Sequence, residues 1–126
     1  IEHLVEWLPE MSNIQLRSYY ALDNVVVCDQ YSPSLAIFGS IGREASWYGR
    51  LIITAYKSWN TLYFGADNPP HVFPAITTGE IISAMRSVEQ LSAEDKSSRS
   101  NQGQQWGKRN FGTDQVIPRF LNLIKQ

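Results

Sequence analysis

The chain carries the stretch SWYGRLIITAYKSWNTLYF at residues 46–64. Its middle part, from Leu51 to Tyr56, is almost entirely apolar and rich in β-branched side chains. Because successive side chains of a strand point to opposite faces of the sheet, a strand here is apolar on both faces. Such a strand is typical of the centre of a sheet that is covered on both sides. We therefore predict a central strand over residues 46–57.

Four other segments have the features of shorter strands, and tight turns connect them. Asp23 and Asn24 both tolerate a positive φ, which predicts a β-hairpin between the first two segments. Gly39 and Gly42 mark another turn, which leads into the central strand. The four segments are 14–22, 25–28, 35–38 and 62–64. Connections this short join antiparallel neighbours, so the sequence predicts an antiparallel sheet of about five strands.

Helical periodicity appears before and after these strands. A first short helix is predicted over residues 1–8, and Pro9 ends it because proline has no N–H to donate. A second helix begins after Thr77, which forms a capping box with Glu80. Its apolar face continues to Leu91.

A third helix is predicted at the end of the sequence, beginning at Thr113 or Asp114. Pro118 is tolerated there because the first helical turn has N–H groups without internal partners. The apolar face of this helix consists of Val116, Ile117, Phe120, Leu121 and Ile124. Helices that are separate from hairpin-connected strands indicate an α+β fold. We therefore predict an antiparallel sheet with a short N-terminal helix and two C-terminal helices.

Length and composition indicate one domain. The chain has 126 residues, of which 43% are hydrophobic and 18% charged, as in a globular domain that spans 1–126. Eleven basic and twelve acidic residues nearly balance, so the whole chain has no excess charge that would attract nucleic acid or an anionic membrane. Over 93–112 the apolar periodicity gives way to Ser, Gln, Asn and Gly. We expect this segment to be mobile, because burial cannot offset the entropy of ordering it.

The single cysteine, Cys28, follows three valines, which predicts a buried side chain. A lone cysteine forms no intrachain disulfide, so the chain does not need an oxidising compartment. No apolar run approaches the ~20 residues that span a bilayer, and we expect no transmembrane segment. These features favour an intracellular, cytoplasmic protein.

The residues that carry catalysis or bind metals are few. His71 follows a Pro-Pro loop and could meet Asp67 or Cys28, which keeps a small enzyme as one alternative. A structural zinc site needs four ligands at workable spacing, and two distant histidines with one cysteine provide no such motif. We expect no catalytic residue, metal or cofactor.

The aromatic residues of the central stretch suggest a binding surface. Three modest helices can cover one face of a sheet well, and the other face then exposes large rings. Exposed aromatic patches mark association sites, and Trp and Tyr are enriched at binding hot spots. The main hypothesis is therefore a non-catalytic interaction or assembly module that binds a protein partner or forms a homo-oligomer. The residues expected to bind are Trp47, Tyr56, Trp59 and Tyr63.

A second hypothesis is the binding of single-stranded nucleic acid by the segment 93–112. Basic and aromatic side chains are interleaved there, a pattern that can stack on bases and contact phosphates. The residues are Arg99, Trp106, Lys108, Arg109 and Phe111. The four basic and two acidic residues of the segment leave only +2, which predicts weak and salt-sensitive binding.

Overall fold

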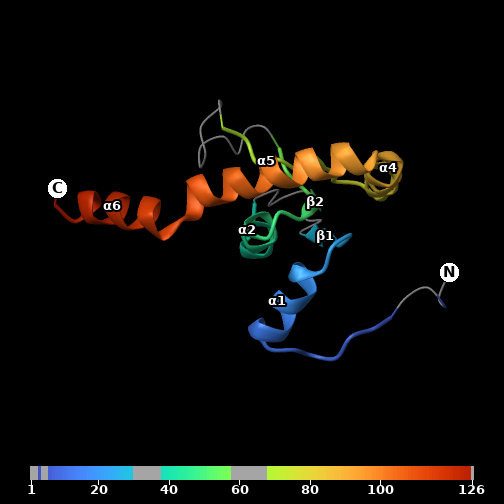
Figure 1. Cartoon of the computed structure of the whole chain (residues 1–126), viewed down its shortest axis with the longest axis horizontal. Helices are drawn as coiled ribbons and strands as arrows, with labels where there is room; N and C mark the ends of the chain where they lie inside the picture. The colour runs from blue at the N-terminus through green and yellow to red at the C-terminus, as the bar shows by residue number, and fades with distance from the viewer. Residues whose placement is uncertain (1–2, 4–5, 30–37, 58–67, 126) are drawn as a thin grey trace.

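The structure is a computed structural model, and it describes residues 3, 6–29, 38–57 and 68–125. Figure 1 shows the chain and labels its helices and the strands β1 and β2. In chain order they are α1 (Asn13–Ala21), β1 (Val26–Asp29), α2 (Ser40–Trp47), β2 (Leu51–Thr54), β3 (Phe73–Pro74), α4 (Thr78–Gln90), α5 (Ala93–Phe111) and α6 (Thr113–Leu123). None of the helices within these residues is long and apolar enough to cross a membrane.

The sheet has three strands in the order β1-β2-β3, and both neighbouring pairs are parallel. Val26 pairs with Leu51, and Asp29 with Thr54. The predicted antiparallel sheet of five strands is therefore wrong, although the α+β class is confirmed. Parallel neighbours need a crossover rather than a hairpin, and α2 provides it between β1 and β2.

The predicted hairpin over 14–28 is wrong because its first strand is the helix α1. Ser12 caps this helix with a capping box: its hydroxyl accepts a hydrogen bond from the N–H of Gln15 (3.4 Å), and the Gln15 side chain accepts one from the N–H of Ser12 (2.8 Å). Leu16 and Tyr20, four residues apart, pack toward the core. In a segment this short, the same apolar residues fit both the alternation of a strand and the spacing of a helix.

The predicted central strand is shorter than expected, because residues 46 and 47 belong to α2 and β2 covers only Leu51–Thr54. Gly39, predicted to lie in a turn between strands, is the N-cap of α2. Gly49 has φ 69°, a conformation that favours glycine, and it turns the chain from α2 into β2. Its carbonyl accepts a hydrogen bond from the hydroxyl of Ser100, which joins this turn to α5.

The two later helices are confirmed. At the start of α4, the Glu80 carboxylate accepts hydrogen bonds from the N–H groups of Ile76 (2.7 Å) and Thr77 (2.8 Å), which lower its pKa. The last helix, α6, begins at Thr113, so Pro118 is its sixth residue and lies beyond the first turn. The strand predicted over 62–64 and all but the last residue of the strand predicted over 35–38 lie outside the described residues. Of the helix predicted over 1–8, residues 3 and 6–8 are described, and residues 6–10 are not helical.

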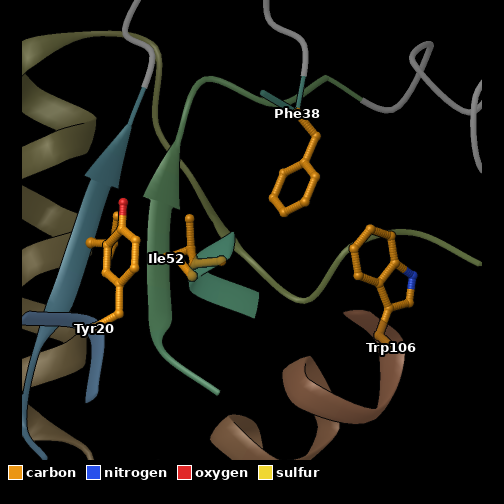
Figure 2. Close-up of a cluster of buried hydrophobic side chains, with 6 residues drawn as sticks. Tyr20, Phe38, Ile52 and Trp106 are labelled. Atoms are coloured by element: carbon orange, nitrogen blue, oxygen red, sulfur yellow. The ribbon is translucent and has the colours of Figure 1, made fainter. Parts of the chain in front are cut away.

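The two faces of the sheet contact two separate cores. The first core lies on the side of α1 and α2 (Figure 2), and consists of Tyr20, Val27, Phe38, Ala45, Ile52 and Trp106. The second core lies under α4, and consists of Ile53, Ala75, Ala84 and Val88. Because β2 contributes Ile52 to one core and Ile53 to the other, its two apolar faces are covered as the sequence predicts.

The segment 93–112 contains the 19-residue helix α5, which the sequence did not predict. Four residues of α5 are buried, Gly103, Trp106, Gly107 and Asn110, and their spacing places them on one helical face. Three of them are not large apolar residues, which is why apolar periodicity did not reveal the helix. The sequence predicts too little burial to order this segment, but the narrow buried face of α5 provides some. The mobility of the segment stays a prediction.

The close contact of α5 with α2 depends on Gly107. A Cβ atom at this position would lie 3.0 Å from Ser46 Cβ and 3.2 Å from the Ser46 carbonyl carbon, and Ser46 is buried. We expect Gly107→Ala to lower the free energy of unfolding by about 1–3 kcal/mol, because the two helices must move apart. The midpoint of thermal unfolding, followed by circular dichroism, measures the effect.

Gly103→Ala is the matched control on the same helix. Its Cβ would lie 3.9 Å from His71 Cβ, an ordinary contact, so the better helix propensity of alanine should stabilise the protein by up to about 1 kcal/mol. We therefore expect Gly107→Ala to lower the midpoint of thermal unfolding and Gly103→Ala to raise it. Equal stabilisation by both substitutions would contradict a tight contact at Gly107.

Candidate functional site

The structure describes two of the four aromatic residues predicted to bind a partner. Trp47 ends α2 and is 42% exposed. Tyr56 follows β2 and is half-buried against the first core, and this burial raises the pKa of its phenol. Trp59 and Tyr63 lie outside the described residues. The aromatic surface stays a prediction, with Trp47 as its exposed member among the described residues.

The aromatic residues predicted to stack on bases face inward. Trp106 is 1% exposed, and its ring meets Phe38 edge-on at 5.3 Å between centroids. Its Nε1–H donates a hydrogen bond to the carbonyl of Asn68 (3.1 Å). Phe111 is half-buried against the first core, and the guanidinium of Arg43 lies 5.1 Å from its ring centroid. The geometry of these two rings therefore does not support stacking on a base.

The basic residues predicted with them are exposed on α5. Arg99 lies near the start of the helix, and its guanidinium is 5.2 Å from the ring centroid of Phe73. Lys108 and Arg109 lie in its last turn, where positive charge interacts favourably with the helix dipole. The described structure thus keeps these three cations accessible.

Among the elements that the structure describes, α6 has the most exposed large apolar side chains, and the sequence predicts it as a helix but not as a site. No residue of α6 is buried. Figure 1 shows that α6 continues beyond the end of α5 and away from the sheet. Its large apolar side chains are Val116 (45% exposed), Ile117 (49%), Phe120 (61%), Leu121 (42%) and Leu123 (68%), and Ile124 (64%) follows as the C-cap.

A groove of about 710 Å³ lies on the second-core side of the edge strand β1. Val26 and Cys28 of β1 line it, with Met85 of α4 and Lys96 of α5 on the other sides. The prediction that Cys28 is buried is wrong, because its side chain points to the face of β1 that α4 leaves open. Volumes of this size are typical of ligand pockets, but this one is open and its lining mixes apolar groups with charges of both signs.

Polar side chains lie at the carboxyl ends of the parallel strands, on the face of the sheet that contacts the first core. Asp29 and Thr54 are register partners at the ends of β1 and β2, and both are buried. The negative charges of Glu44 and Asp29 act on the nearby phenol of Tyr20, whose pKa is raised by burial first and by these charges second. Among the described residues, neither the hydroxyl of Thr54 nor that of Tyr56 has a hydrogen-bond partner.

We predict that the buried hydroxyl of Thr54 lowers the free energy of unfolding. We expect Thr54→Val to raise the free energy of unfolding by about 1 kcal/mol, since a methyl group replaces a buried hydroxyl that has no partner. Thr77→Val is the matched substitution with the opposite sign, because the Thr77 hydroxyl caps α4 by accepting from the N–H of Glu80 (3.3 Å). Urea unfolding measures both; destabilisation by Thr54→Val would show that its hydroxyl is hydrogen-bonded in solution.

Of the groups of the enzyme alternative, the structure does not bring His71 and Cys28 together. His71 precedes β3 and lies beside α5, whereas Cys28 lines the groove at β1, and His71 is not part of that lining. Asp67, the other group suggested for His71, lies outside the described residues. Partial burial, and then the charges of Arg109 and Arg99, lower the pKa of His71. No three His, Cys, Asp or Glu side chains of the described segments could together hold a metal ion.

Comparison of the chain with protein-family models, with curated proteins and with solved structures finds no match. The proposals below therefore rest on the described geometry alone.

Proposed function

We propose that this protein is a non-catalytic association module that forms a homodimer through α6. The observation that carries the proposal is the exposed apolar face of α6, six side chains that are each 42–68% exposed. Soluble monomers rarely expose a continuous apolar patch of this kind unless it binds something.

The helix α6 has little to stabilise it within one chain. It has 11 residues, and isolated helices shorter than about 12–15 residues are marginal in water. No side chain caps its N-terminus, and Pro118 removes one hydrogen bond from its interior. A partner that buries the apolar face would supply the missing stability.

The order of residues in α6 favours a second copy as the partner. Four apolar positions are symmetric about Phe120: Ile117 and Leu123 lie three residues before and after it, and Val116 and Ile124 lie four before and after. Leu121 departs from this symmetry, since its counterpart is Arg119. Two antiparallel copies centred on Phe120 would therefore place Phe120 and these four side chains opposite apolar side chains. This is the self-complementary surface that a two-fold interface requires.

Charge is compatible with the same arrangement. In the antiparallel pair, Asp114 of one copy lies near Lys125 of the other, because both are about one and a half turns from Phe120. Asp114, Arg119 and Lys125 all belong to the polar side of the helix. The pairing therefore brings opposite charges together at each end.

The exposed area predicts a weak dimer. Full burial of one large apolar side chain contributes about 1.5–3 kcal/mol, and those of α6 are already partly covered, so each contributes roughly 1 kcal/mol more. Association costs about 4–15 kcal/mol. The twelve side chains of two copies together contribute roughly 12 kcal/mol, which exceeds the lower end of this cost by roughly 8 kcal/mol. We therefore expect a dissociation constant of about 1 μM or weaker.

Sedimentation velocity over low micromolar to near-millimolar concentrations tests the proposal. A monomer–dimer equilibrium is expected, with the dimer fraction rising with concentration. A protein that stays monomeric at the highest concentration, with α6 helical, would contradict it. Binding of the aromatic residues Trp47, Tyr56, Trp59 and Tyr63 to a partner stays a separate prediction.

The carboxyl edge of the sheet favours a second candidate function, the binding of a small ligand that carries hydroxyl groups. In open parallel sheets ligands bind outside the carboxyl ends of the strands, where an acidic residue can accept hydrogen bonds from sugar hydroxyls. Asp29 and Thr54 end neighbouring strands there. Thermal-shift measurements with nucleosides test this; stabilisation that is lost in Asp29→Asn would support it, and no stabilisation by any nucleoside would contradict it.

A further inference from the structure

Hydrogen bonds of Asn68 hold the segment 68–73 along one side of α5. The Asn68 carbonyl accepts from Trp106 Nε1 (3.1 Å), and the Asn68 side chain donates to Oδ1 of Asn110 (2.9 Å). Farther along the helix, a Cβ on Gly103 would lie 3.9 Å from His71 Cβ. His71 is therefore held beside the middle of α5, where Gly103 leaves room for it.

Two arginines of α5 lie on either side of this point. Arg99 precedes Gly103 by about one turn, and Arg109 follows it by less than two. Both are exposed, and within the described ranges neither forms an ion pair with a carboxylate. The Arg99 guanidinium is oriented by its contact with the ring of Phe73.

The electrostatics of this surface favour an anion. Arg109 and Arg99 are the charged groups that act on His71 from α5, and they disfavour its protonated form. The neighbours contributed by the segment 68–73, Asn68 and Phe73, carry no charge. Positive groups that lie on either side of His71 without a described counterion gain from an anion placed between them.

We propose that His71, Arg99 and Arg109 form a binding site for a phosphate monoester. Guanidinium groups bind phosphate oxygens through parallel N–H donors, and an imidazole adds one donor, or two when it is protonated. A monoester fits better than a nucleic-acid strand, because the two aromatic residues of α5, Trp106 and Phe111, face the core. This inference is independent of α6 and of dimer formation.

Proton NMR of the two histidines tests the site on the whole protein, with inorganic phosphate and then a nucleoside monophosphate as probes. His71 is expected to shift along a saturable curve, and its pKa should rise when phosphate is bound, since the anion favours the protonated imidazole. His3, which is exposed near the start of the chain, is the internal control and should not follow the same curve.

Arg99→Gln and Arg109→Gln are each expected to weaken phosphate binding about tenfold or more, as for the loss of hydrogen bonds to a charged group. Arg86→Gln changes the net charge equally on the exposed surface of α4 and should leave binding unchanged. Equal weakening by all three variants, or equal shifts of His3 and His71, would reduce the effect to general charge attraction and overturn the proposal. A single-stranded oligonucleotide that binds where phosphate and the monophosphate do not would overturn the monoester in favour of a nucleic-acid strand.

Discussion

Trp106→Ala is expected to lower the free energy of unfolding by about 3–5 kcal/mol, as for other large residues removed from a core. Trp106 is 1% exposed, contacts Phe38 and Phe111 edge-on, and donates a hydrogen bond to the Asn68 carbonyl. Truncation would leave a cavity between α5 and the sheet and an unpaired carbonyl. A domain of this size has a free energy of unfolding of about 5–15 kcal/mol. Urea unfolding should therefore show that Trp106→Ala loses a large fraction of this free energy.

Trp47→Ala is the matched control, because it removes the same side chain from a surface position. Trp47 is 42% exposed, and the hydrogen bond that it accepts from Gln104 (3.1 Å) uses the backbone carbonyl, which alanine keeps. We expect a loss below about 1 kcal/mol. Equally large losses of stability in both variants would contradict the burial of Trp106 in the first core.

Phe120→Asp is expected to abolish the dimer at concentrations where the unmodified protein associates. Four apolar positions of α6 and its C-cap are symmetric about Phe120, so the substitution places two carboxylates, one from each copy, next to each other in the proposed interface. Loss of an interface hot spot costs about 2 kcal/mol or more, and the repulsion adds to this. The dissociation constant should rise at least about thirtyfold, as measured by sedimentation velocity.

Asn122→Asp is the control, because it adds the same charge on the polar side of α6. It should leave the dissociation constant within about twofold, since exposed charges interact weakly in water. Circular dichroism of both variants verifies that the body of the protein is folded. Dissociation by both variants alike would implicate net charge rather than the apolar face.

Local signals in the sequence predicted two helices correctly. The Thr77–Glu80 capping box begins α4, and apolar spacing defines α6, because both signals act within a few residues. The same kind of signal was available for α1, where Ser12 and Gln15 form a capping box. Alternation over 14–22 concealed it, since a short run of apolar residues suits either period.

The parallel sheet could not be predicted from such local signals. Pairing of β1 with β2 depends on the crossover through α2, and the sequence around Gly39 and Gly42 suggested a turn instead. The helix α5 was missed because its close contact with α2 depends on the small size of Gly107. Close helix contact of this kind has no apolar pattern to detect.

The candidate sites were only partly visible in the sequence. Apolar spacing identified the face of α6, but the finding that none of its residues is buried in the described structure required coordinates. Arg99 and Arg109 were predicted as cations of a nucleic-acid site, whereas His71 was considered only as a catalytic base. Their proximity follows from the docking of 68–73 on α5, a contact between segments that lie far apart in the sequence.

The position of Trp106 also has a consequence for how the chain acquires its structure. The contact between Phe38 and Trp106 joins residues 38 and 106 of the sequence, so the first core closes only after residue 106 has been synthesised. Until then the apolar face of β1, α2 and β2 has no α5 to cover it. Such long-range closure slows folding and exposes apolar surface meanwhile, so truncation before residue 106 should yield aggregates rather than a smaller domain.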